Sequence, residues 1–201
     1  MLQIILASKS PRRKLLLSQL GLAFEVFPSN LNEDISESDP VKLVEQLALQ
    51  KAEEVAKQCS NSLIIGADTV VVHSGEVLGK PKNEAEAAKM LKRLSGDNHS
   101  VYTGIAFVKT DKDRLIERTK SFYEQTNVQF STLSAQEIKA YVKSGSPMDK
   151  AGAYGIQDDL GALFVERIEG DYYNVVGFPL NRFYRELKIF SPEFFLFSAD
   201  D

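Results

Sequence analysis

The sequence lacks the features that mark a secreted or membrane-embedded protein. Its 201 residues contain a single cysteine, Cys59, which excludes an internal disulfide and a metal–thiolate cluster. No apolar run approaches the roughly eighteen residues of a membrane-spanning helix. The first strand-like stretch, residues 2–7, is too short for the apolar region of a secretory signal. We therefore expect a soluble protein that works in the cytoplasm.

The chain has slightly fewer basic than acidic residues. Lys and Arg number 24 against 28 Asp and Glu, which gives a formal net charge of -4. Binding of nucleic acid without regard to sequence needs a basic surface, and no aromatic-rich basic patch supplies one. The glycine-rich signature of a P-loop is missing too. A small basic cluster could still bind a small polyanion, because local arrangement matters more than the sum.

Strand-like and helix-like segments alternate along most of the chain, which favours an α/β fold. No repeat or low-complexity linker divides the chain. We therefore expect one domain over residues 1–190, followed by a tail over 191–201 that is flexible or packs on a partner. The expected strands are 2–6, 23–27, 63–72, 76–78, 101–108 and 122–130, with a hairpin of 161–168 and 171–176.

Capping residues predict where the helices begin. Ser10 followed by Pro11 is a helix start, and Pro40 and Pro179 open two others. Two pairs resemble capping boxes, in which the side chains of an N-cap and the third helical residue cap each other's backbone. These pairs are Asn83 with Glu86 and Ser134 with Glu137.

The first segment with chemical character is the strand-to-helix junction from Ser8 to Arg13. A helix start offers free N–H groups and the positive end of the helix dipole, so it can bind an anion. Arg12 and Arg13 oppose that dipole unless an anion lies nearby. Such a conflict with the local rule is typical of functional sites. The alternative is two solvated arginines on a surface turn.

The second is Asp68, inside the apolar run of residues 63–72. A carboxylate there bears a desolvation cost unless it is paired or binds a metal. Gly66 and Ala67 leave room for a ligand to approach the backbone. The alternative is a strand that ends at Gly66, with Asp68 in a turn. The β-branched stretch from Thr69 favours the continuous strand.

Lys51 lies four residues after Leu47 and seven after Val44, on the apolar stripe of its helix. It must either extend along the surface to water or reach a buried anion. The helical periodicity alone does not decide between these two arrangements of the Lys51 side chain.

Two loops carry further candidates. Lys80 lies at a strand end between Gly79 and Pro81, where it could meet a phosphate. Gln157 ends a glycine-containing stretch, and its amide matches the N3–H donor and O4 acceptor of uracil or thymine. Glu33, in an acidic loop, could help to hold a metal ion. The alternative for each of these three residues is an ordinary position in a solvated loop.

Taken in order, these segments resemble the Maf family of nucleotide pyrophosphatases. The resemblance spans about residues 2–190. The matching stretches are LASKSPRR (6–13), GADTVV (66–71), LGKP (78–81), TG (103–104), DKAGAYGIQ (149–157) and GDYYNVVG (170–177).

The resemblance implies a mixed central sheet with flanking helices and two lobes around a cleft, similar to inosine-triphosphate pyrophosphatases. It also implies metal-dependent hydrolysis between the α and β phosphates, and homodimers are common in the family. The stretch ending in Gln157 is similar to the subgroup that acts on dTTP and UTP. Asp68 matches the proton acceptor. Arg12, Thr69 and Gln157 match positions of base choice, and Ser8, Arg13, Glu33, Lys51 and Lys80 match other cleft positions.

These expectations combine into a hypothesis of nucleotide-pool housekeeping. Basic residues and Mg²⁺ or Mn²⁺ would bind the triphosphate, with Asp68 and Glu33 as metal ligands. Phosphate oxygens and water complete the octahedron of Mg²⁺, so no dense acid cluster is needed. The substrate would be dTTP, UTP or a modified pyrimidine nucleotide. The alternative function is a nucleotide-binding regulator of cell division without significant catalysis.

Overall fold

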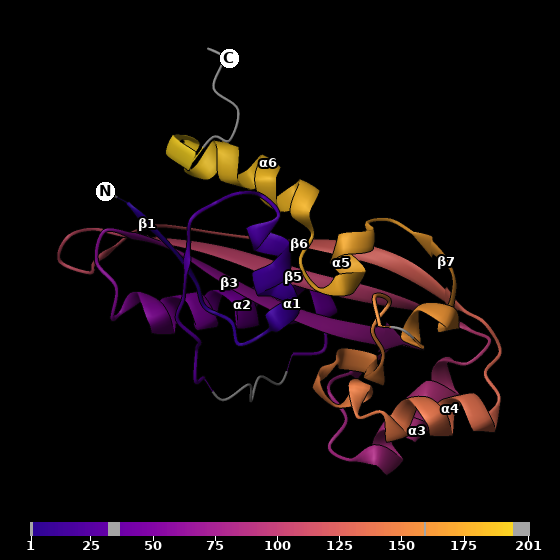
Figure 1. The fold of residues 1–201 in the computed structure, drawn as a ribbon. Coiled ribbons are helices and arrows are strands. Elements are labelled where there is room, and N and C mark those ends of the chain that lie inside the picture. Colours follow the sequence, from indigo (N-terminus) through magenta and orange to yellow (C-terminus); the bar gives the residue numbers. More distant parts are fainter. Residues whose placement is uncertain (1, 32–36, 159, 195–201) are drawn as a thin grey trace. The chain divides into compact units, whose positions relative to one another are not determined.

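The computed structural model describes residues 2–31, 37–158 and 160–194 (Figure 1). Within these ranges the strands form one sheet in the order β2-β1-β3-β5-β6-β7, and β4 pairs with β3 off this path. β1 pairs in parallel with β2 and β3, whereas β4 and β7 pair antiparallel with β3 and β6. The strands are β1 (Gln3–Leu6), β2 (Glu25–Val26), β3 (Ser62–His73), β4 (Glu76–Leu78), β5 (Asn98–Thr110), β6 (Ile116–Phe130) and β7 (Val165–Glu169).

Five α-helices begin at or next to the capping residue or proline predicted to start them. The Ser10 side chain accepts from the Arg13 amide, Asp39 caps the helix that opens at Pro40, and Ser134 forms a full capping box. The mixed α/β sheet with helices is thus confirmed. The α-helices are α1 (Pro11–Ser18), α2 (Pro40–Ala56), α3 (Glu84–Leu94), α4 (Ala135–Lys143), α5 (Tyr172–Val176) and α6 (Leu180–Phe190). The 3₁₀ turns are η1 (Ser146–Asp149), η2 (Ala151–Ala153), η3 (Gly161–Phe164) and η4 (Pro192–Phe194).

The chain divides into two compact units. Unit 1 comprises Met1–Asp68, Thr103–Glu124 and Gly177–Asp201, and unit 2 comprises Thr69–Tyr102 and Gln125–Val176. Strands β3, β5 and β6 therefore each contribute residues to both units. The single domain over residues 1–190 stays a prediction.

In unit 1, α2 and α6 cover opposite faces of the sheet. Small residues of α2, among them Ala48 and Ala52, pack with Ala106 of β5. The next side chain along β5, Phe107, points to the other face and contacts Phe183 of α6 with ring centroids 5.5 Å apart. Because alternate residues of a strand face opposite sides, both faces of this part of the sheet are buried.

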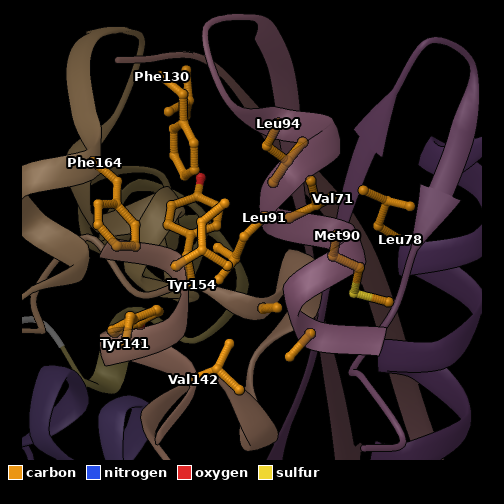
Figure 2. Close-up of a cluster of buried hydrophobic side chains, with 14 of the residues drawn as sticks. Val71, Leu78, Met90, Leu91, Leu94, Phe130, Tyr141, Val142, Tyr154 and Phe164 are labelled. Carbon is orange, nitrogen blue, oxygen red and sulfur yellow. The ribbon is translucent and has the colours of Figure 1, made fainter. Parts of the chain in front are cut away.

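In unit 2, helices α3 and α4 lie side by side (Figure 1) over a core that Figure 2 shows in close-up. Tyr154 lies between aromatic and aliphatic neighbours there, with its ring centroid 4.7 Å from that of Phe130. Leu91 and Leu94 contribute the apolar stripe of α3. This core holds the loop that follows α4 against the sheet.

The predicted hairpin of 161–168 and 171–176 is wrong. Residues 161–164 form the 3₁₀ turn η3, and strand β7 begins only at Val165. Residues 171–176, predicted as the second strand of a hairpin, contain helix α5. The Asp171 carboxylate accepts from the backbone N–H of Asn174, which starts the helical turn. The buried Asn174 amide then donates to the Val101 carbonyl at 3.1 Å and to Thr126 Oγ1 at 3.0 Å. These hydrogen bonds outweigh the strand propensity of the valine-rich sequence.

The predicted tail begins at Ser191. Ser191 is buried, and Glu193 pairs with Lys109 at 3.1 Å. Residues 195–201 lie outside the described part of the chain. Among the described residues, none of the helices is both long and apolar enough to cross a membrane.

Candidate active site

Asp68 lies within strand β3 and not in a turn. The strand continues past it to His73, and Asp68 is only 8% exposed. A carboxylate in that position must be compensated by a partner or a ligand. The interpretation of Asp68 as a turn residue is therefore wrong.

The partner of Asp68 is Lys51 of α2. Lys51 Nζ lies 2.6 Å from Asp68 Oδ1, and both side chains are 11% exposed. The lysine on the apolar stripe thus reaches a buried anion and does not extend to water. A hydrogen-bonded pair of this kind fixes the orientation of the carboxylate.

Helix α2 can carry Lys51 this close because it lies almost on the sheet backbone. A Cβ atom added to Gly66 would lie 2.0 Å from the Ala48 carbonyl oxygen, and one added to Gly104 would lie 2.3 Å from that of Val44. Any side chain at either position would push the helix away. Both glycines belong to stretches that carry the family resemblance.

Arg13 joins three segments of unit 1. Its Nη1 donates to the Ala67 carbonyl at 2.7 Å and to Ser8 Oγ at 3.3 Å, and its Nε donates to the Gly177 carbonyl at 3.1 Å. Ala67 immediately precedes Asp68. Arg13, predicted to bind phosphate, therefore also ties the segment after β1 to the middle of β3 beside the buried carboxylate.

Arg12 lies beside it in the first turn of α1 and is half-buried. That turn contains no acidic residue, so nothing of its own counters the positive end of the helix. Ser8 is buried, and its Oγ accepts from the Ser10 N–H at 3.2 Å. The predicted anion-binding junction is thus an ordered strand-to-helix connection with a net positive charge.

The remaining candidates belong to unit 2. Thr69 follows Asp68 directly on β3 and is half-buried, Lys80 is exposed beyond β4, and Gln157 is exposed in the loop after η2. The described residues of unit 1 thus bring together Ser8, Arg13, Lys51 and Asp68, whereas the base-reading candidates Thr69 and Gln157 lie in the other unit.

A divalent cation would find a single described carboxylate at this position. Glu33, the second predicted ligand, lies outside the described residues, and residues 2–31, 37–158 and 160–194 contain no group of three His, Cys, Asp or Glu able to hold a metal. One carboxylate fits Mg²⁺ that takes its other ligands from phosphate and water. It does not fit a cage built from protein alone.

Sequence patterns did not mark every residue that shapes this region. The Gly177 carbonyl that Arg13 contacts is 164 residues away along the chain. Tyr141 and Asp158, which contact the loop of Gln157, are also unmarked: Tyr141 counts as one more apolar position of α4, and Asp158 as a loop acid. Only the adjacency of Asp158 to Gln157 offered a signal.

Comparison with known proteins agrees with the resemblance. Residues 3–190 match the family described as Maf-like protein. A dTTP/UTP pyrophosphatase of Bacillus cereus is 52% identical over 192 residues, 95% of this chain and 97% of the relative, and one of Bacillus anthracis is 51% identical with the same coverage. Among solved structures, a HAM1 protein from Coxiella burnetii matches with a TM-score of 0.47 and 20% identity, over 65% of this chain and 73% of that one. With a match over nearly its whole length, the chain belongs to the family of Maf-like proteins.

Proposed function

We propose that this protein is a nucleoside triphosphate pyrophosphatase, which hydrolyses dTTP and UTP to the monophosphate and pyrophosphate. The observation that carries the proposal is the buried carboxylate of Asp68, oriented by Lys51 at 2.6 Å beside the basic start of α1. Relatives about half identical over 95% of the chain bear the name dTTP/UTP pyrophosphatase, which supports the same reaction.

In this mechanism Asp68 acts as the general base. It takes a proton from a water molecule whose oxygen forms a bond to the α-phosphorus, while the bond from that phosphorus to the bridging oxygen breaks. Pyrophosphate leaves with the electron pair of that bond. Lys51 holds the carboxylate in one orientation, which lowers the entropic part of the barrier.

Positive charge stabilises the triphosphate and the leaving pyrophosphate. We assign this role to Arg12 and Lys80, with Ser8, Arg13 and Lys51 as further contacts. Asp68, with Glu33 as the second proposed ligand, would hold Mg²⁺ or Mn²⁺, which would supply additional charge neutralisation. Arg13 also acts structurally, because it donates to the carbonyls of Ala67 and Gly177.

Base choice is assigned to Gln157, Thr69 and Arg12. The Gln157 amide can accept from N3–H and donate to O4 of a uracil or thymine ring. A cytosine ring presents the reverse pattern at these positions, so a fixed amide would discriminate between the two. Modified pyrimidines that keep this edge are included in the substrate class. A cytoplasmic location and a homodimer belong to the same proposal.

The first experiment measures pyrophosphate release from dTTP, UTP, CTP, ITP and 7-methyl-GTP, each with Mg²⁺, Mn²⁺ or EDTA. We expect metal-dependent release from dTTP and UTP, and a large loss in Asp68→Asn. Release from another base would retain the reaction and remove the assignment of Gln157. Nucleotide binding without any release would instead favour the regulator of cell division.

A further inference from the structure

Gln157 occupies a tightly closed turn. The Asp158 N–H donates to the Gly155 carbonyl at 3.1 Å, so residues 155–158 form a four-residue turn with Gln157 in its third position. Gln157 is exposed, whereas Gly155 and Ile156 before it are buried. The position of its amide therefore depends on what holds the two ends of the turn.

A single hydroxyl group holds both ends. Tyr141 Oη accepts from the Gly155 N–H at 3.1 Å and donates to Asp158 Oδ2 at 3.0 Å. The Tyr141 side chain belongs to the buried core of Figure 2, where its ring packs edge-on against Phe164 with centroids 5.0 Å apart. Burial raises the pKa of Tyr141 far above its usual value, so the hydroxyl keeps its proton and remains a donor.

The Asp158 carboxylate is fixed from two other directions. Its Oδ2 accepts from Ser146 Oγ at 2.6 Å and lies 3.1 Å from Nζ of the buried Lys150. Lys150 Nζ also donates to Asp149 Oδ1 at 2.8 Å and, separately, to the Ser146 carbonyl. The acidic end of the turn thus has three partners, the hydroxyl groups of Tyr141 and Ser146 and the Lys150 ammonium, and it cannot shift without breaking these contacts.

Two glycines allow the turn to pack closely against its surroundings. A Cβ atom on Gly155 would lie 2.7 Å from Asp158 Oδ2, and one on Gly161 would lie 2.3 Å from the Gly155 carbonyl oxygen. The backbone is therefore packed directly against the polar groups that hold it. A binding residue supported in this way is held to within the small tolerance that hydrogen-bond recognition requires.

We propose that Tyr141 and Asp158 are positioning residues that set the base selectivity of the enzyme by holding Gln157. The inference rests on the proposed function, in which the Gln157 amide reads the pyrimidine edge. Without the two contacts of Tyr141 the turn samples other positions, and the amide gains less from the correct base. The contacts proposed to bind the phosphates do not change. The preference for dTTP over CTP therefore falls more than kcat does.

The test compares Tyr141→Phe and Asp158→Asn with Tyr154→Phe as matched control. Tyr154 is a second buried tyrosine of the same core, but its hydroxyl contacts His99 Nε2 at 2.7 Å and not the turn. For each variant we would measure kcat and KM with dTTP and CTP. We expect the ratio of kcat/KM values, dTTP over CTP, to fall about fivefold in the first two variants, through KM, as for the loss of one hydrogen bond. The ratio should stay unchanged in the control.

Two further measurements separate positioning from general loosening. In a double-mutant cycle, Tyr141→Phe should not lower the ratio further once Gln157→Ala has removed the amide. Exchange of the Asp158 amide hydrogen should be faster in Tyr141→Phe than in Tyr154→Phe.

An unchanged ratio in Tyr141→Phe and Asp158→Asn, with a reduced ratio in Gln157→Ala, would overturn the inference and leave the proposed function intact. Equal amide exchange in the two tyrosine variants would also overturn it. If the wild-type protein hydrolysed dTTP but Gln157→Ala kept full selectivity, the base-reading role and this inference would fail together. If the wild-type protein released no pyrophosphate, the proposed function itself would fail.

Discussion

Lys51 Nζ lies 2.6 Å from Asp68 Oδ1, and the two side chains are equally buried at 11% exposure. They lie seventeen positions apart along the chain. Each would be a costly isolated charge, and each is tolerable because of the other. The pair therefore links the fold of unit 1 to the chemistry proposed for Asp68.

Removal of one charge from this pair should cost both stability and activity. Asp68→Asn deprives the buried Lys51 ammonium of the carboxylate 2.6 Å away, so we expect the free energy of unfolding to fall by about 3 kcal/mol. Loss of the general base should lower kcat by about 10³-fold. Urea unfolding and pyrophosphate release measure the two effects.

A double variant separates the effect on stability from the effect on activity. Lys51→Met combined with Asp68→Asn removes both charges, so it should be more stable than the sum of the single losses predicts. It should remain inactive, because the base is still missing. Additive stability losses would contradict the coupling, and recovered turnover would contradict the catalytic role.

Arg13 should be more important for stability than the exposed Lys14 of the same helix. Arg13→Lys cannot reproduce the contacts to the carbonyls of Ala67 and Gly177, because an ammonium lacks the planar fork of a guanidinium. We expect the variant to lose roughly 2 kcal/mol of unfolding free energy. Lys14→Arg, a change at an exposed position of the same helix, is the control and should keep the stability. Equal thermal stability of the two variants would show that the Arg13 contacts contribute little.

Gly66→Ala should displace helix α2. Its Cβ would meet the Ala48 carbonyl oxygen at 2.0 Å, and Lys51 lies on the same helix one turn further on. We expect unfolding free energy to fall by about 2 kcal/mol and kcat to fall with it, since Lys51 moves relative to Asp68. Gly79→Ala is the control, because its Cβ meets nothing within 4 Å and should change stability by less than about 1 kcal/mol. A Gly66→Ala protein as stable as the control would mean that α2 tolerates the displacement.

Acid should destabilise the protein through His99. Burial lowers the pKa of His99 from 6.5 to about 4, so between these pH values the unfolded chain binds a proton that the folded chain does not. Stability contributed by neutral His99 is thus complete above pH 6.5 and is lost as the pH falls towards 4. The slope should approach about 1.4 kcal/mol per pH unit.

Urea unfolding at several pH values checks this dependence. His99→Gln carries no titrating group at this position, so its stability should depend less on pH over the same range. An equally steep decline in the variant would assign the effect to another group.

Several features of the protein follow from local sequence, because their causes are local. Ser10, Asp39 and Ser134 cap the helices that follow them through hydrogen bonds within three residues. The apolar run around Asp68 forms one strand, and the 3.6-residue period places Lys51 on the inner face of α2. The same reasoning was wrong for residues 171–176, where valine favoured a strand but the buried amide of Asn174 required a helical turn.

What the sequence by itself determined is the type of most elements, the family, and the polar residues that enter apolar surroundings. Only the tertiary structure decided which groups those residues meet: Asp68 for Lys51, the Ala67 and Gly177 carbonyls for Arg13, and the Gln157 turn for Tyr141. The physical reason is the distance along the chain over which each kind of interaction acts. Caps and periodicity act over a few residues, whereas these contacts join atoms 14 to 164 positions apart, and they form only after strand register and helix packing have fixed the backbone.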